Sequence, residues 1–381
     1  MNRTRIAAAA LALAASFQAG AQQAKEPLKI GALLSVTGPA AFLGAPEART
    51  LEMLVEELNA KGGVDGRKIE LVVKDTGGNP EKAISFAKQL VEENGVFAII
   101  GPATSGETIA VKQIAEESKT ILLSCAAAEV IVNPVLPYVF KVAPKDSYAA
   151  EMIFRQMKKM GVKRIGVLSS NTGFGKAGKD QVEKLAPSHG IEIAASEVYD
   201  KAATDLTAEV TKLKAAKVQA ILNWSIEPAQ SIVIKNARQI GLTVPIFQSH
   251  GFANVQYAKA AGAAAEGVIF PASRIVVAES LAASDKQKPV VAAYKKSYEA
   301  RYKEDVSTFG GHAWDAFGIL VRAVKEAGLD REKARKAIEN MKGFVGTAGV
   351  FNFSPEDHNG LAIDAFEMLT VKDGKFVVLG R

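Results

Sequence analysis

Segments that look like buried strands alternate with segments of helical periodicity along most of this chain. The run 28–34 is almost continuously apolar, and 47–58 repeats leucine and valine along one helical face. The same patterns predict, in chain order, strand 69–73, helix 80–93, strand 96–100, helix 106–117, strand 121–123, helix 147–160, strand 163–169, helix 175–186, strand 191–198, helix 204–216, strand 218–223, helix 228–240 and strand 245–247. Such alternation forms parallel sheets that are covered by helices on both faces. Because the rhythm restarts after Pro144, the sequence predicts an α/β fold with two doubly wound, Rossmann-like lobes.

The C-terminal part of the chain departs from this alternation. Helical patterns at 288–303, 312–327 and 330–341 follow one another, and a hairpin signal, Asp373-Gly374, then joins two apolar runs. Neither lobe is closed by a single run of sequence, so we expect the chain to cross between the lobes more than once. Ligands of such sheets bind beyond the carboxyl ends of the strands, and the cleft between two lobes is therefore the expected site.

The first residues have the pattern of a secretion signal. Two arginines precede the apolar run 6–15, which is too short to span a bilayer, and 19–21 is a small-x-small cleavage site. The sole cysteine, Cys125, lies deep in the chain, so no thiol follows this site to carry a lipid anchor. We therefore expect 1–21 to be a signal peptide that is cleaved after Ala21, and the mature protein to be periplasmic.

Composition and motifs argue against several classes of function. The 47 lysines and arginines are interspersed with 41 acidic residues, so the chain lacks the basic patch of a nucleic-acid-binding protein. Metal-site spacings such as HExxH and CxxC, phosphate-binding glycine motifs and the G-x-S-x-G elbow are absent from the sequence. Cys125 lies between leucines and alanines, and this setting is typical of a small buried side chain. We expect no metal, no cofactor and no enzymatic activity.

Two turns at strand ends are candidate ligand sites. The turn after strand 96–100 places Ser105 and the first free N–H groups of a helix toward the cleft, where they suit a carboxylate. The alternative is that Thr104 or Ser105 only caps the helix. The next turn, 124–128, could present main-chain groups of Ala126 and Ala127 to a ligand, or only let a helix approach the sheet.

The chain resembles the periplasmic leucine/isoleucine/valine-binding proteins of ABC importers. The resemblance is carried by the strand 30–39, the turns 101–108 and 124–128, and the stretches 172–175, 205–207 and 237–242. It implies a non-enzymatic, monomeric receptor of the type I periplasmic binding protein fold, which closes on a small solute and delivers it to a permease in the inner membrane. It also implies a hinge of three crossovers, near 146, 273 and 350. The implied lobes are 22–146 with 274–349, and 147–273 with 350–381.

The resemblance carries over to individual ligand residues. Ser105 keeps the family's carboxylate-binding serine, Ala126 and Ala127 can supply the main-chain groups, and Ala128 stands where a threonine is expected. His250 stands where the family places the acid that holds the ligand's ammonium group. Three further candidates are apolar where the family often has tyrosine, namely Leu43, Phe174 and Ile226.

These departures change the expected ligand. A buried ammonium group without a carboxylate partner is costly, so the site favours an acid with an apolar body: an aromatic acid, an aryl 2-oxo acid or a branched-chain 2-oxo acid. His312 and Trp314 belong to a segment that resembles an aromatic-acid-binding subgroup, and both are candidate ligand residues. Three alternatives stay open: a branched-chain amino acid as the ligand, a ligand sensor for a chemoreceptor or regulator, and an exported enzyme that uses Cys125 or His250.

Overall fold

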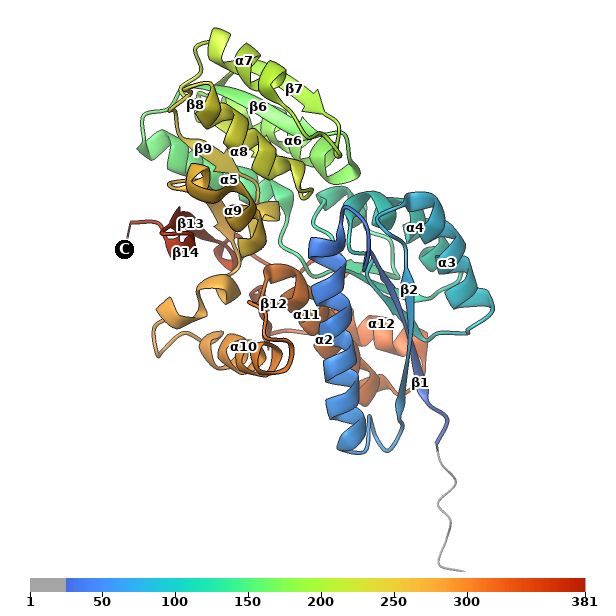
Figure 1. The fold of residues 1–381 in the computed structure, drawn as a ribbon. Helices are drawn as coiled ribbons and strands as arrows, with labels where there is room; N and C mark the ends of the chain where they lie inside the picture. The colour runs from blue at the N-terminus through green and yellow to red at the C-terminus, as the bar shows by residue number, and fades with distance from the viewer. Residues whose placement is uncertain (1–24, 381) are drawn as a thin grey trace, which may run out of the picture.

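The computed structural model describes residues 25–380, which form two lobes that are each built on a largely parallel sheet (Figure 1). The expected signal peptide and its cleavage site lie outside the described residues. Between residues 25 and 380, no helix has both the length and the apolar character that a membrane crossing requires.

The first lobe holds a five-stranded parallel sheet in the order β2-β1-β3-β4-β5. Its strands are β1 (Leu28–Leu34), β2 (Ile69–Asp75), β3 (Ala98–Ile100), β4 (Ile121–Ser124) and β5 (Val139–Lys141), and its first helices are α2 (Ala41–Ala60), α3 (Pro80–Glu92) and α4 (Ser105–Glu117). Neighbouring residues of β1 point to opposite faces: Leu33 packs with α3 and α4, whereas Leu34 belongs to the cluster that includes α2. The predicted double-wound layering is thereby confirmed.

The second lobe holds a seven-stranded sheet in the order β14-β13-β10-β9-β8-β6-β7. Its strands are β6 (Arg164–Ser170), β7 (Glu192–Tyr199), β8 (Ala220–Trp224), β9 (Ile246–Gln248), β10 (Ile269–Ala272), β13 (Glu367–Lys372) and β14 (Lys375–Val378). Helices α5 (Asp146–Lys159), α6 (Gly173–Leu185), α7 (Thr207–Ala215), α8 (Ala229–Gln239) and α9 (Val255–Ala261) surround it. The hairpin β13–β14 turns at Asp373 and Gly374, which both have positive φ, as the Asp-Gly signal predicts.

The chain between β10 and β13 returns to the first lobe. This part contains α10 (Lys288–Tyr302), α11 (Thr308–Ala327), α12 (Arg331–Glu339) and a small hairpin of β11 (Phe344–Val345) and β12 (Val350–Phe351). Helix α11 packs along α2, and Arg331 donates hydrogen bonds to the carbonyls of Val96 and Phe97. The chain therefore passes between the lobes three times, while the exact lobe bounds inferred from the family resemblance stay a prediction.

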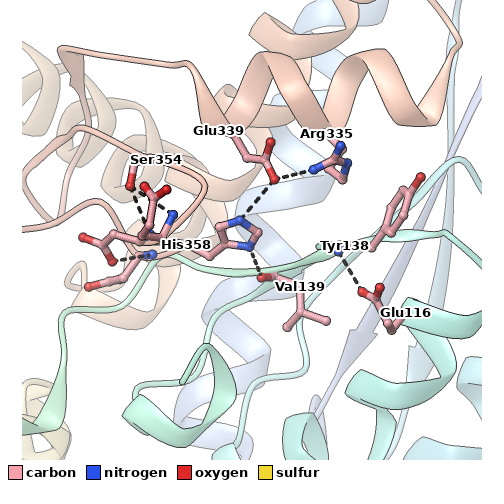
Figure 2. Close-up of polar contacts among 10 residues, drawn as sticks. Glu116, Tyr138, Val139, Arg335, Glu339, Ser354 and His358 are labelled. Carbon is pink, nitrogen blue, oxygen red and sulfur yellow. Dashed lines mark hydrogen bonds and ion pairs between the residues drawn. The ribbon is translucent and has the colours of Figure 1, made fainter. Parts of the chain in front are cut away.

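One return segment is fixed to the first lobe by a buried histidine (Figure 2). The His358 Nδ1 lies 2.9 Å from the Val139 carbonyl, which can only accept, so Nδ1 carries the proton. The Nε2 atom lies 3.3 Å from a Glu339 carboxylate oxygen, and Glu339 also pairs with Arg335. The next residue, Asn359, donates to the carbonyls of Lys141 and Ala143. These bonds hold the crossover segments side by side.

Helix α9 was not predicted, and the start of α2 also differs from the predicted one. We expected α2 to begin at residue 47, after Pro46, but it begins at Ala41 and includes the proline in its interior. Proline lacks an N–H, so the carbonyl of Phe42, four residues earlier, has no helical donor. The Asn254 side chain donates to that carbonyl instead. A partner from a distant part of the chain thus lets the helix start earlier than the local pattern indicates.

Candidate functional site

A small cavity of about 20 Å³ lies between the two lobes. It is lined by Leu43, Ala103, Ser105, Cys125, Ala126, Ala127, Ala143, Phe174, Ile226, His250, Gly251, Phe309 and His312. The lining comes from the starts of α4 and α6, the turns after β4, β8 and β9, and the facing parts of α2 and α11. These strand ends and helix starts are where ligands of doubly wound sheets bind. A second hollow of about 170 Å³ shares Phe174 and Ile226 with this cavity.

Ser105 lies in the first-lobe wall and is fully buried as the first residue of α4. Thr104 is the helix cap, because its hydroxyl accepts from the Glu107 N–H. The Ser105 hydroxyl is therefore not needed as a cap. It accepts a bond of 3.2 Å from the Ala128 N–H, which leaves its own proton to be donated toward the cavity.

In the alanine turn after β4, some main-chain N–H groups are bonded within the protein and one is available to a ligand. The N–H of Ala126 donates to Ser124 and that of Ala128 to Ser105, so both are already bonded. In the part of the chain that the structure describes, the Ala127 N–H has no hydrogen-bond partner. Ala126 and Ala127 line the cavity, whereas Ala128 lies behind it. The Ala127 N–H and the Ser105 hydroxyl are the donors that suit a ligand carboxylate.

His250 lies in the second-lobe wall, enclosed by aromatic rings. It belongs to a short helical turn after β9, and its ring lies edge-on to those of Phe174 and Trp224 at 5.3 and 5.7 Å. The following residue, Gly251, has no room for a side chain, because a Cβ there would lie 2.4 Å from the Ser225 carbonyl oxygen. Close packing thus fixes the direction of the imidazole.

Both cavity histidines are neutral. His250 and His312 are 7% and 5% exposed, and all four ring nitrogens lack a hydrogen-bond partner among the described residues. Burial, together with the smaller effect of the nearby Lys141 charge, lowers the pKa of each imidazole to about 3. Lys, Arg, Asp and Glu are absent from the residues that line the described cavity.

Buried acids lie outside the cavity wall. Glu47 is fully buried, and burial together with the charge of Glu107 raises its pKa well above the usual range. Glu227 lines the second hollow, where it accepts hydrogen bonds from the Ser225 hydroxyl and the Ile226 N–H. Within residues 25–380, no cluster of histidine, cysteine or acidic residues could hold a metal ion.

Most of the predicted site residues come together in the cavity, but Ala128 and Trp314 do not line it. The Trp314 ring packs against Phe344, with 6.3 Å between ring centroids. Trp314 is two residues beyond His312 on α11, and residues two apart point to different sides of a helix. The lining residues that sequence reasoning did not name as ligand residues are Ala103, Cys125, Ala143, Gly251 and Phe309. Phe309 lies three positions before His312, so helical spacing could have indicated it.

Comparison with known proteins agrees with this architecture. Residues 27–375 match the periplasmic binding protein family. The chain is 26% identical to the leucine-, isoleucine-, valine-, threonine-, and alanine-binding protein of Pseudomonas aeruginosa, over 86% of each chain. It is 27% identical to Leu/Ile/Val-binding protein homolog 7 of Brucella suis, over 96% of this chain and 94% of that one.

Solved structures agree as well. An extracellular ligand-binding receptor from Rhodopseudomonas palustris HaA2 superposes with a TM-score of 0.87 at 28% identity, covering 92% of this chain and 99% of that one. The branched-chain amino acid transporter substrate-binding protein LivJ of Streptococcus pneumoniae, in complex with isoleucine, gives 0.81 at 28% identity, over 92% of this chain and 97% of that one. The chain therefore belongs to the Leu/Ile/Val-binding family of periplasmic binding proteins, the non-enzymatic substrate-binding proteins of ABC transporters.

Proposed function

We propose that this protein binds a small carboxylate with an apolar body in the periplasm and delivers it to an ABC permease of the inner membrane. The observation that carries the proposal is the pairing of two carboxylate donors, the Ser105 hydroxyl and the Ala127 N–H, with an otherwise apolar wall. Leu43, Phe174 and Phe309 supply much of that wall. An acid group at the donor end and a hydrophobic body against these side chains would satisfy both parts.

The wall chemistry favours an acid that lacks an ammonium group. No carboxylate lines the described cavity, and His250, at the position where the family resemblance places an acid, is a neutral imidazole. A buried ammonium group would therefore lack a charged partner. We propose an aromatic acid, an aryl 2-oxo acid or a branched-chain 2-oxo acid as the ligand.

Branched-chain amino acids are the second candidate. The relatives are named as leucine-, isoleucine- and valine-binding proteins or as a branched-chain amino acid transporter protein. These names support an amino acid as the ligand more directly than an acid without nitrogen. Glu227 adds a specific observation, because this buried acid follows the cavity residue Ile226 and lines the adjoining hollow. It could pair with the ammonium group of such a ligand.

Mechanistically, we propose that closure couples binding to delivery. The ligand would contact Ser105 and Ala127 on one lobe and Phe174 and His250 on the other, so it binds the closed form most tightly and shifts the population toward it. In this proposal the protein acts as a monomer, with lobes at 22–146 with 274–349 and at 147–273 with 350–381.

Calorimetric titration tests the ligand class. Mature protein, unfolded and refolded to remove carried-over solute, is titrated with leucine, benzoate, phenylglyoxylate and 4-methyl-2-oxopentanoate. We expect tight binding of one of the three acids without nitrogen and weak or no binding of leucine. Leucine as the only tight ligand would instead support the second candidate and a role for Glu227.

A further inference from the structure

We propose that binding of an anionic ligand places one proton on the pair His250 and His312. The inference rests on the proposed function only in that the ligand is a carboxylate. It goes further by assigning the positive charge that balances the ligand to this histidine pair. The ligand then binds as an anion, and one of the two imidazoles takes up a proton.

The two histidines approach the same cavity from opposite lobes. His250 follows β9 in the second lobe, and His312 lies on α11, which packs along α2 in the first. Each side chain is more than nine-tenths buried. Both ring nitrogens of His250 lack partners among the described residues, and the His312 ring has only an interaction with the Cys125 main chain that falls outside ordinary hydrogen-bond geometry. Buried polar atoms in native proteins are normally hydrogen-bonded, so these nitrogens point to a ligand that completes them.

The need for a counter-charge follows from the rest of the wall. A carboxylate that enters the closed cavity loses its hydration, which is costly unless a cation or strong donors replace the water. The lining of the described cavity contains neither lysine nor arginine. The imidazoles are therefore the lining groups that can become cationic near neutral pH.

The surroundings keep both rings neutral until an anion arrives. His250 faces the rings of Phe174, Trp224 and Phe366, and the titratable groups that act on it electrostatically are Lys141 and His312. Burial and the Lys141 charge both disfavour an imidazolium there, and they lower the pKa of His250 to about 3. A carboxylate in contact acts in the opposite direction.

His312 has a similar environment. The ring of Phe309 lies edge-on to it at 6.2 Å, the Cys125 main chain favours its protonated form, and Lys141 again opposes protonation. Because both rings are neutral in the free protein at pH 7, the proton has to come from the solvent when the ligand binds.

Lys141 is the competing acceptor for this proton. It is fully buried, its ammonium group donates to the carbonyl of the lining residue Ala143, and burial lowers its pKa to about 7. A bound anion would raise that pKa too. Lys141 does not line the cavity, however, whereas the two histidines do, so the contact favours the imidazoles.

The test measures proton uptake directly. The protein is titrated at pH 7 with benzoate, phenylglyoxylate and 4-methyl-2-oxopentanoate in phosphate and in Tris, whose ionisation enthalpies differ, and the difference in apparent binding enthalpy gives the number of protons bound. We expect close to one proton per carboxylate, and an affinity that falls as the pH rises from 7 to 8. His250→Gln and His312→Gln keep a hydrogen-bonding side chain but cannot titrate, and at least one should abolish the uptake. His189→Gln is the control, because His189 pairs with Glu151 outside the cavity.

The possible failures are distinct. A carboxylate that binds tightly without proton uptake overturns this inference and leaves the proposed function standing. Uptake that persists in both glutamine variants and disappears in Lys141→Met also overturns it, because the proton then resides on the lysine. If only leucine binds, the proposed anionic ligand and this inference fall together.

Discussion

The side-chain amide of Asn254 donates a hydrogen bond of 3.1 Å to the main-chain carbonyl of Phe42, joining the second lobe to the first. This acceptor is available because Pro46 has no N–H to bond it within α2. The same Asn254 side chain caps α9, since its oxygen accepts from the Gln256 N–H. The Asn254 side chain thus caps the start of α9 in one lobe and bonds to the other lobe.

The bond lies close to the ligand cavity. The Phe42 ring packs edge-on against Tyr257 at 5.1 Å, and the Tyr257 hydroxyl donates to the Ile226 carbonyl. Ile226 and Leu43, the neighbour of Phe42, both line the cavity. The contact therefore stabilises the arrangement of lobes in which the cavity is enclosed.

We expect Asn254→Asp to weaken ligand binding several-fold. Aspartate still caps α9, but an ionised carboxylate cannot donate to the Phe42 carbonyl, so about 1 kcal/mol of closed-state stabilisation is lost. Pro46→Ala should act in the same direction, because it restores a helical donor that competes for that carbonyl. Titration calorimetry gives the affinity, and small-angle X-ray scattering of the unliganded protein gives the change in closure. Wild-type affinity and scattering in Asn254→Asp would contradict the assignment.

This contact also shows where the sequence stops being informative. Long amphipathic helices were predictable because their signals are local: α3 runs from Pro80 to Glu92, after the cap Asn79, close to the predicted 80–93. The start of α2 was not predictable, because the Phe42 carbonyl accepts its hydrogen bond from Asn254, which is more than two hundred positions away in the sequence. The short strands β5 and β10 were not predicted, although β4 and β9 are equally short and were predicted, and pairing with neighbouring strands is what defines β5 and β10.

The candidate site also has a part that the sequence could predict and a part that it could not. Ser105 and the alanines of the next turn follow strands, so the topology rule alone brings them to the cleft. His250 was placed by resemblance, and its enclosure by three aromatic rings was not predictable from local sequence. Trp314 was named as a ligand residue together with His312, but the two side chains lie on different sides of α11. The sequence alone did not indicate which side of this helix faces the cavity.

We expect Gly173→Ala to hinder closure and its counterpart Gly106→Ala to be tolerated. A Cβ on Gly173 would lie 2.7 Å from the Gly106 Cα, whereas a Cβ on Gly106 would lie 3.7 Å from the Gly173 nitrogen, an ordinary contact. Gly173 is the first residue of α6 and Gly106 is the second residue of α4, and the two helices meet across the cleft. Relief of the overlap requires the lobes to separate.

The pair therefore gives a matched experiment. Gly173→Ala should weaken binding by about 1 to 3 kcal/mol, as other overpacked contacts do, while the melting temperature of the unliganded protein stays near that of wild type. Gly106→Ala should change neither. Equal affinities in the two variants would show that this contact does not limit closure.

We expect Ser105→Ala to weaken binding of the carboxylate by about 1 to 3 kcal/mol, the range for a hydrogen bond to a charged group. Titration calorimetry measures the loss, and Ser105→Thr, which keeps a hydroxyl, should recover part of it. Ser118→Ala, at the other end of α4, is the control. Since Ser105 also accepts from the Ala128 N–H, the melting temperature of the unliganded variant has to be measured in parallel. Unchanged affinity would remove Ser105 from the site.

Asp315 should make the protein less stable as the pH rises. Its carboxyl is fully buried on α11 and accepts hydrogen bonds from the N–H groups of Thr347 and Ala348, which favour the charged form. Burial outweighs them and raises the pKa of Asp315 to about 7. The folded state thus keeps a proton that the unfolded state, with its ordinary pKa of about 3.9, has already lost.

The sign of the effect follows from this difference. The contribution of Asp315 to stability is complete below the unfolded pKa and is lost as the pH rises to about 7. Asp315→Asn cannot titrate, so the free energy of unfolding of wild type relative to this variant should fall by about 3 kcal/mol between about pH 5 and pH 8, at 1.36 kcal/mol per pKa unit. Urea unfolding of both proteins across that range measures the difference. A constant difference would mean that the Thr347 and Ala348 donors keep Asp315 charged in the folded protein, and that its hydrogen bonds outweigh its burial.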